Sequence, residues 1–196
     1  MGGAPVSSQL IDFNKTSSTK IFETYGMTET ITHVAVRPLN HFETKADDKA
    51  FEILPDISIS LDDRKCLVIN APNISDEPVI TNDIVELVSE KKFIWLGRYD
   101  NVINSGGIKL IPEQIEQKLS TLIDSRFFVS ALPDVKLGQK LVLVIEGENI
   151  EGLRELINKS DLDKFELPKE IFYVPSFQNT ANGKIIRDKS LSMIKS

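Results

Sequence analysis

The first half of the chain consists of short hydrophobic runs alternating with polar positions. Asp, Pro and Asn separate the runs, and a polar, turn-like stretch occupies positions 40–49. This pattern is typical of short antiparallel strands, and a short helix over 7–14 is predicted before them. The predicted strands are Lys20–Glu23, Thr32–Val36, Phe51–Ile53, Ile57–Leu61, Cys66–Asn70, Ile84–Val88 and Phe93–Leu96.

The pattern changes after Arg98. Apolar residues at helical spacing, with a proline in the first turn, predict a helix over Pro112–Leu119. Strands and a second helix alternate beyond it. The fold class predicted for the chain is α+β, with a small antiparallel β-unit over 1–97 and a compact α+β unit over 98–196. The remaining elements predicted for the second unit are Arg126–Val129, Leu141–Ile145, Gly152–Lys159 and Glu170–Val174.

Composition and charge narrow the function classes. The net charge of −6 and the lack of a basic run argue against nucleic acid as a partner. The chain has one cysteine, Cys66, in a strand-like run, which predicts a buried thiol and fits a reducing, cytoplasmic compartment. No apolar run approaches the roughly 18 residues of a membrane span, and no signal peptide is visible. The only histidines are His33 and His41, so no metal-binding cluster is expected.

Three segments carry residues suited to nucleotide chemistry. Tyr25–Thr30 (Tyr-Gly-Met-Thr-Glu-Thr) offers an aromatic ring for a base, hydroxyls for a phosphate and a carboxylate for Mg²⁺. The stretch Gly97–Glu113 combines Arg98 and Asp100 with two adjacent glycines. Thr180–Arg187 places Lys184 after Asn-Gly in a turn-prone loop. Each has a plainer alternative: a polar strand-to-loop connection, a surface Arg–Asp pair and a hairpin-turn lysine.

Three further features are weaker. Gly2–Pro5 contains small residues that would let a backbone approach a flat ligand, although a simple turn explains it equally. Asp83 precedes a predicted strand and could accept hydrogen bonds from vicinal ribose hydroxyls, or it could be an ordinary turn residue. His33 is read as a strand histidine, although it could face a carboxylate substrate.

Taken together and in this order, the three segments resemble the adenylate-forming enzymes, which include acyl- and aryl-CoA ligases, luciferases and the adenylation domains of peptide synthetases. The resemblance extends from Gly2 to about Ile194. It implies ATP, Mg²⁺ and CoA as cofactors or co-substrates and a small-molecule carboxylate as substrate. It also implies that 1–97 is the C-terminal part of the large AMP-binding domain and 98–196 the mobile C-terminal domain.

The resemblance implies a role for each candidate residue. Gly3, Ala4 and Tyr25 would lie near adenine, Thr28 on the α-phosphate, and Glu29 on the metal. Asp83 and Arg98 would bind the ribose or phosphate, Asp100 would be the hinge between two domain orientations, and Gly106 and Gly107 would line the pantetheine path. Lys184, Thr28 and Glu29 would be the catalytic residues. Among them, Lys184 would bridge the substrate carboxylate and the α-phosphate. The family usually has Thr-Gly-Asp where this chain has Thr81-Asn82-Asp83.

Within that family, Tyr25–Thr30 followed by Thr32–Arg37 is most similar to the o-succinylbenzoate–CoA ligases of menaquinone synthesis. The second carboxylate of that acid could meet Arg37 or His33. Three alternatives stay open: another acyl- or aryl-CoA ligase, an adenylation domain that loads a carrier protein, and a non-catalytic fragment that binds nucleotide or a partner.

The family's phosphate-gripping loop, rich in Ser, Thr and Gly and ending in Lys-Gly, is absent from this sequence. We therefore expect the chain to be a C-terminal portion of a longer ligase and to be inactive in adenylation by itself. Lacking its partner layers, the segment from Gly2 to Leu96 is expected to expose apolar surface, which makes self-association into oligomers an expectation as well.

Overall fold

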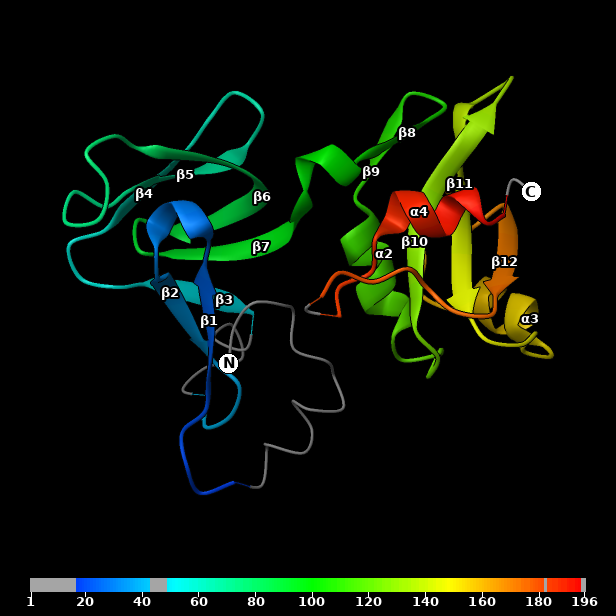
Figure 1. Cartoon of the computed structure of the whole chain (residues 1–196), viewed down its shortest axis with the longest axis horizontal. Helices are drawn as coiled ribbons and strands as arrows, with labels where there is room; N and C mark the ends of the chain where they lie inside the picture. Colours follow the sequence, from blue (N-terminus) through cyan, green and yellow to red (C-terminus); the bar gives the residue numbers. More distant parts are fainter. Residues whose placement is uncertain (1–16, 43–48, 182, 195–196) are drawn as a thin grey trace. The chain divides into compact units, whose positions relative to one another are not determined.

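The computed structural model describes residues 17–42, 49–181 and 183–194. The chain divides into two compact units, Met1–Tyr99 and Asp100–Ser196. The division falls within the predicted boundary region at Arg98–Asp100. Figure 1 labels the strands and helices of both units. The predicted helix over 7–14 lies outside the described residues, as do Gly3, Ala4 and Asn182.

The first unit is built on an antiparallel sheet. Its described strands lie in the order β1-β2-β3-β7-β6-β5-β4, and every paired strand runs antiparallel to its neighbour. A 3₁₀ turn, η1 (Thr28–Thr30), joins β1 to β2. The strands are β1 (Phe22–Gly26), β2 (His33–Pro38), β3 (Ala50–Ile53), β4 (Ser58–Leu61), β5 (Cys66–Asn70), β6 (Val79–Ser89) and β7 (Lys92–Arg98).

Alternating side chains of this sheet form one core. Buried residues recur at every second position, as in Phe51 and Ile53 or Leu67 and Ile69, so one face of each strand packs inward. Cys66 is fully buried, as its strand-like context predicts. The rings of Phe51 and Phe93 stack with their centroids 5.6 Å apart. The predicted antiparallel β-unit is therefore confirmed.

The second unit combines a sheet with three described helices. The sheet has the order β10-β11-β8-β9, and β12 adds to β11 in parallel. A parallel neighbour needs a crossover connection, and α3 supplies it between β11 and β12. The elements are η2 (Tyr99–Asn101, at the junction), β8 (Ile103–Ser105), β9 (Ile108–Leu110), α2 (Pro112–Leu119), β10 (Phe127–Asp134), β11 (Gly138–Glu146), α3 (Leu153–Asn158), β12 (Glu170–Val174) and α4 (Arg187–Ser192).

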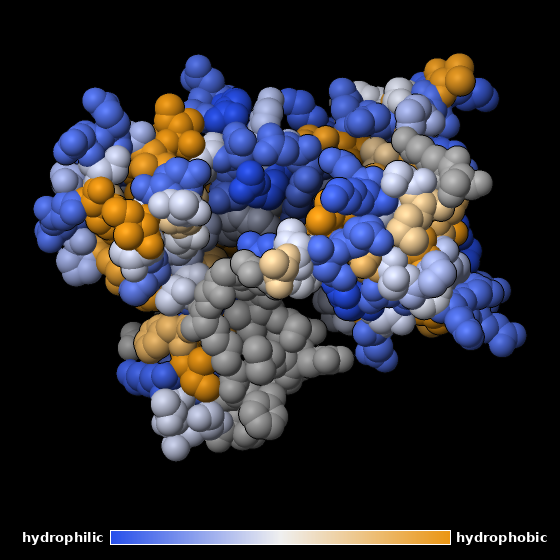
Figure 2. All heavy atoms as spheres, viewed as in Figure 1, coloured by the Kyte–Doolittle hydropathy of each residue, from blue (hydrophilic) through white to orange (hydrophobic). Residues whose placement is uncertain are grey.

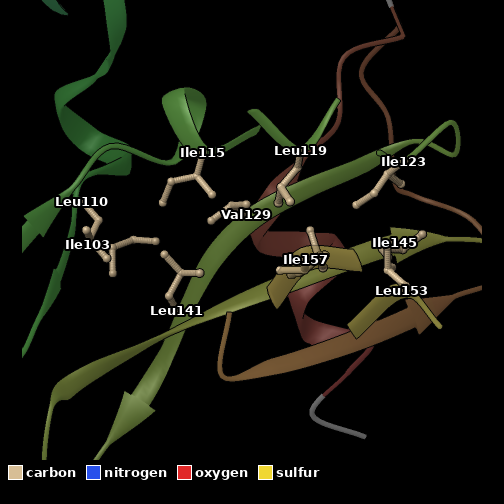
Figure 3. Close-up of a cluster of buried hydrophobic side chains, with 11 residues drawn as sticks. Ile103, Leu110, Ile115, Leu119, Ile123, Val129, Leu141, Ile145, Leu153 and Ile157 are labelled. Carbon is tan, nitrogen blue, oxygen red and sulfur yellow. The ribbon is translucent and has the colours of Figure 1, made fainter. Parts of the chain in front are cut away.

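The central strand β11 is apolar on both faces. Leu141 to Ile145 are all buried, since one face meets α2 and α3 while the other meets residues of α4 and the segment before it. Figure 3 shows the first of these cores, in which Ile115 and Leu119 from α2 and Leu153 and Ile157 from α3 converge with strand residues. The apolar run at Leu141–Ile145 thus follows from two covered faces.

The α+β prediction is confirmed, and the differences are local. Strand β6 extends over Val79–Ser89, well beyond the predicted Ile84–Val88, because it pairs with β5 along one end and β7 along the other. Helix α4 was not predicted, since Arg187–Ser192 is short and polar and gains its helical state from packing Leu191 on the sheet. No helix within the described residues is long and apolar enough to cross a membrane.

Polar side chains cover much of the visible surface, with hydrophobic patches between them (Figure 2). The expectation that the first unit exposes apolar side chains agrees with the observed exposures, whereas oligomerisation stays a prediction. The exposed large hydrophobic residues of this unit, among those described, are Phe22, Ile31, Phe42, Leu61, Ile80, Leu87, Val88 and Tyr99.

Candidate functional site

Asp83 is the centre of a polar cluster in the first unit. Its carboxylate Oδ2 accepts a hydrogen bond of 2.5 Å from the Tyr25 hydroxyl, and its Oδ1 lies 3.7 Å from Nε of Arg98. The backbone N–H of Asp83 donates to the hydroxyl of Thr81 at 3.0 Å. Only 6% of Asp83 is exposed, so a buried carboxylate is held beside a permanent positive charge.

The register of the sheet explains part of this convergence. Asp83 and Arg98 are directly paired across β6 and β7. Tyr25 lies on β1, four strand positions away from β6, which in a flat sheet is about 19 Å. The hydroxyl reaches Asp83 because the sheet curves and Tyr25 packs across Phe93, with ring centroids 5.2 Å apart. The sequence prediction was wrong in two details: Asp83 lies inside strand β6 rather than before it, and Tyr25 lies in β1 rather than in a loop.

Burial, and then the negative charge of Asp83, raise the pKa of the Tyr25 hydroxyl above its ordinary value of 10.0. The phenol therefore stays protonated and acts as a donor to the carboxylate. The Arg98 side chain is 47% exposed, so its guanidinium reaches the surface at the end of β7. The arrangement places a carboxylate beside a guanidinium where β7 ends, a combination able to bind hydroxyl and phosphate oxygens.

Replacing Tyr25 by Phe should flatten the alkaline limb of the stability profile. A raised folded-state pKa contributes stability that is complete below pH 10 and is lost as the pH rises through that pKa. We expect the unfolding free energy of the first unit to fall between pH 10 and about 11.5 by about 1.5 kcal/mol more in the unmodified protein than in Tyr25→Phe. The fluorescence of Trp95, the single tryptophan, measures it. Equal slopes in both proteins would contradict the assignment.

The Thr28–Thr30 turn projects polar groups outward. Thr30 is buried, and its hydroxyl, a single donor, lies within hydrogen-bond distance of the carbonyl oxygens of Thr32 at 2.8 Å and Met27 at 3.0 Å while accepting from the Met27 N–H at 3.1 Å. Thr28 and Glu29 remain exposed. The buried hydroxyl therefore fixes the turn and leaves the Thr28 hydroxyl and the Glu29 carboxylate available to a ligand.

Glu29 provides a single carboxylate. Among the described residues, no group of three or more His, Cys, Asp or Glu side chains could hold a metal. Mg²⁺ commonly keeps several waters and binds one or two carboxylates together with substrate phosphates. Glu29 therefore fits a Mg²⁺ ion that arrives with a nucleotide, and does not form a resident metal cage.

Gly26, at the end of β1, is needed for close backbone approach. A Cβ at this position would lie 2.6 Å from the carbonyl oxygen of Thr32 and 2.7 Å from Cα of His33. We expect Gly26→Ala to lower the unfolding free energy of the first unit by about 2 kcal/mol, because backbone atoms must shift. Urea unfolding followed by Trp95 fluorescence tests this. Ser60→Ala, on an exposed strand position, should change it by less than about 0.5 kcal/mol, and an equally small effect at Gly26 would refute the prediction.

Asp100 lies in η2, where the two compact units divide, and its side chain is exposed. Next to it, the Asn101 amide donates to Glu113 Oε1 at 2.5 Å, which ties the start of the second unit to the first turn of α2. This hydrogen bond therefore fixes the start of the second unit one residue after Asp100.

The two adjacent glycines form the tip of the β8–β9 hairpin. Ser105 pairs with Ile108, so Gly106 and Gly107 make a two-residue turn, with φ angles of 61° and 84°. Positive φ at both positions is the requirement of a type I′ hairpin turn, which glycine meets without strain. The Gly106 N–H donates to the carbonyl of Leu137 at 2.9 Å, which fixes this tip against the β10–β11 hairpin.

Lys184 lies on the exposed strand-like leg of a hairpin before α4. Asn179 and Ile185 form an isolated antiparallel bridge, and the Thr180 N–H donates to the Lys184 carbonyl at 2.8 Å. The predicted turn-prone loop is therefore present, with Gly183 at a φ of 79°.

Of three residues near these sites, Arg64 carried no sequence signal, whereas Arg37 and His33 were singled out from the sequence. Arg64 donates to the side chain of Asn82 at 2.8 Å and to the carbonyl of Thr81 at 3.1 Å, so it supports the segment before Asp83. Arg37, which the sequence suggested for the second carboxylate of the substrate, forms an ion pair with Glu23 at 2.6 Å. Its positive charge is therefore already compensated within the protein. The exposed His33 has its Nδ1 3.1 Å from the hydroxyl of Thr32. All of these partners except that of His33 lie far away in sequence.

Helix α2 and the start of α4 are linked by charge. Arg187 donates to Glu116 Oε2 at 2.9 Å and to the carbonyl of Val129 at 2.8 Å, and Glu116 Oε1 accepts the Val129 N–H at 2.7 Å. Burial raises the pKa of Glu116, an effect that the charge of Arg187 opposes. This network anchors the C-terminal end of the Lys184 hairpin.

No protein-family model matches the chain. A 2-succinylbenzoate–CoA ligase from Listeria monocytogenes serovar 1/2a is 26% identical to it over 207 residues, which cover 96% of this chain and 44% of the relative. The chain thus spans less than half of that relative's length.

Solved structures of similar proteins also align with nearly the whole chain. An acyl-CoA synthetase (AMP-forming)/AMP-acid ligase II-like protein from Dyadobacter fermentans is 38% identical with a TM-score of 0.51, over 99% of this chain and 57% of that one. The o-succinylbenzoate coenzyme A synthetase of Bacillus subtilis, solved in complex with ATP and magnesium ion, has a TM-score of 0.81 at 19% identity, over 97% of this chain and 45% of its own. At that identity the second likeness shows the fold.

Proposed function

We propose that this chain, which is homologous to the C-terminal part of adenylate-forming acid–CoA ligases, supplies part of the nucleotide site and the mobile catalytic unit of such an enzyme. The carboxylate of the substrate attacks the α-phosphorus of ATP and pyrophosphate leaves. The thiol of CoA then attacks the acyl-adenylate, and AMP leaves. The observation that carries the proposal is the Tyr25–Asp83–Arg98 cluster, formed by three residues expected at a nucleotide site.

Each unit has a part in this scheme. The first unit would be the end of the large AMP-binding domain, in which Asp83 and Arg98 bind the ribose or phosphate and Tyr25 lies near adenine. Thr28 would contact the α-phosphate and Glu29 the accompanying Mg²⁺. Gly3 and Ala4, although outside the described residues, are proposed at the adenine as well. The exposed side chains of Thr28 and Glu29 support this assignment.

The second unit would be the mobile domain, with the hinge at Asp100. It would bring Lys184 to the α-phosphate for adenylation and the Gly106–Gly107 hairpin to the pantetheine arm for thioester formation. An ammonium group there would orient the carboxylate and stabilise the negative charge that builds up on phosphorus. The division of the chain between Tyr99 and Asp100 supports this hinge.

We propose o-succinylbenzoate as the acid, because the Listeria relative that aligns over 96% of the chain is a ligase of 2-succinylbenzoate. We place the enzyme in the cytoplasm, because the lone cysteine is a buried, free thiol and fits a reducing compartment. The alternative is a different aryl or acyl acid, since this chain spans under half of the relative and carries little that would select an acid.

The test is carboxylate-dependent ATP–pyrophosphate exchange. It should be run on this chain alone and on a version extended upstream by the region that the Listeria relative has, with o-succinylbenzoate and a panel of aryl and fatty acids. We expect exchange with o-succinylbenzoate in the extended version alone. Exchange with another acid of the panel would make that acid the proposed substrate in place of o-succinylbenzoate. AMP binding without any exchange would favour a binding fragment, and acyl transfer to a phosphopantetheine protein instead of CoA would favour a carrier-loading domain.

A further inference from the structure

The hairpin that carries Lys184 is short. Among its described residues, the Asn179–Ile185 bridge is accompanied by hydrogen bonds from the Thr180 N–H to the Lys184 carbonyl at 2.8 Å, from the Gly183 N–H to the Thr180 carbonyl at 2.9 Å, from the Lys184 N–H to the Thr180 hydroxyl at 3.1 Å and from the Ile186 N–H to the Gln178 carbonyl at 2.7 Å. Both Thr180 and Gly183 are exposed, as is Lys184. A two-stranded hairpin of this length is marginal by itself, so its orientation depends on contacts with the rest of the unit.

Arg126, just before β10, supplies such contacts from far away in the sequence. Its Nη2 donates to Asn179 Oδ1 at 2.6 Å on one leg of the hairpin and to the Gly183 carbonyl at 3.5 Å on the other. The guanidinium also lies over the ring of Phe177, 5.7 Å from its centroid. One planar group thus contacts the hairpin on both legs and at its base, directly before Lys184.

Glu146, at the end of β11, completes the attachment. Its Oε2 accepts from Nη1 of Arg126 at 3.3 Å, and its Oε1 accepts the Phe177 N–H at 2.6 Å, where the hairpin segment begins. The Glu146 N–H in turn donates to the Arg126 carbonyl at 2.8 Å. The pair is therefore fixed to the ends of strands β10 and β11, and the hairpin is attached to these strands through it.

We infer that Arg126 is a positioning residue, which fixes the Gly183–Lys184 segment so that the Lys184 ammonium has a defined location. This rests on the catalytic role proposed for Lys184. Arg126 belongs to neither core, and its side chain is 45% exposed, so its ion pair with Glu146 adds little stability. Its effect lies in geometry, since Nη2 contacts both Asn179 and Gly183 while Nη1 of the same planar group is held by Glu146.

Arg154 is a matched control in the same unit. It is also exposed and also donates to backbone carbonyls of a loop, those of Pro168 and Lys169, but the segment it holds precedes β12. Arg154→Ala removes the same charge and a similar contact without affecting the Lys184 hairpin.

Two measurements test the inference. On this chain, trypsin should cut after Lys184 about 10-fold faster in Arg126→Ala than in the unmodified protein, relative to cleavage after the exposed Lys159. In the extended enzyme, Arg126→Ala should lower kcat of ATP–pyrophosphate exchange about 10-fold and leave KM for ATP unchanged, since a misplaced catalytic group lowers the rate of the chemical step. Arg154→Ala should change neither quantity.

The outcomes separate the two proposals. Unchanged cleavage and unchanged kcat in Arg126→Ala, in an enzyme that Lys184→Ala inactivates, would overturn the positioning role and leave the proposed function standing. A raised KM for ATP with normal kcat would overturn it too, because that pattern belongs to a nucleotide-binding residue. If Lys184→Ala retains full exchange, the catalytic role of the lysine fails, and the cleavage result alone decides whether Arg126 fixes the hairpin.

Discussion

Replacing Lys184 by Ala is expected to lower the rate of acid-dependent ATP–pyrophosphate exchange roughly 10²–10³-fold, the usual loss for one preorganised donor at a developing negative charge. The side chain is exposed and belongs to no core, so its removal should leave folding intact. The loss should therefore appear in kcat. Exchange in the extended enzyme, with the melting temperature as a folding check, measures it.

The second half-reaction gives the control. When acyl-adenylate is supplied directly together with CoA, Lys184→Ala should form thioester at close to the normal rate, because adenylation is the step assigned to this residue. Lys109, exposed on β9, offers a matched substitution that should affect neither half-reaction. An equal loss in both half-reactions would instead indicate damage to the whole second unit, and the assignment of Lys184 would be withdrawn.

Replacing Asp83 by Asn should raise KM for ATP roughly 10–100-fold, since hydrogen bonds to a charged acceptor contribute about 1.5–3 kcal/mol each. Each oxygen of the carboxylate retains accepting capacity beyond its contact with Tyr25 or Arg98, and a ribose diol needs two such acceptors. The amide of the asparagine retains one acceptor oxygen, which can still accept a hydrogen bond from the Tyr25 hydroxyl. Steady-state exchange at varied ATP, together with calorimetric binding of ATP, measures the effect.

Glu86→Gln is the matched control for this change. It lies on the same strand, β6, but is exposed. It removes the same charge without reaching the cluster, and KM should stay within about twofold of normal. If Asp83→Asn and Glu86→Gln behave alike, the cluster does not bind nucleotide, and Asp83 would then be a structural partner of Tyr25 alone.

Much of the fold follows from local pattern. Alternation along Phe51–Ile53 and Cys66–Asn70 predicts the strands that are found, and Pro112 followed by Ile115 and Leu119 predicts α2. These features depend on neighbouring residues, whose periodicity decides which face is buried. Where pairing with neighbouring strands sets the length of an element, as for β6 with β5 and β7, the prediction fell short.

The candidate residues divide in the same way. The sequence by itself nominated Tyr25, Asp83, Arg98 and Lys184 as candidates, because their chemistry and order are visible in single segments. Only the tertiary structure brought Tyr25 to Asp83, through a curved sheet and an aromatic cluster. Only the tertiary structure showed that Arg64 donates a hydrogen bond to Asn82 and that Arg126 donates one to Asn179 in the Lys184 hairpin. The physical reason is that these hydrogen bonds join residues 18 to 58 positions apart, so they depend on how the chain folds back on itself, which local propensity does not encode.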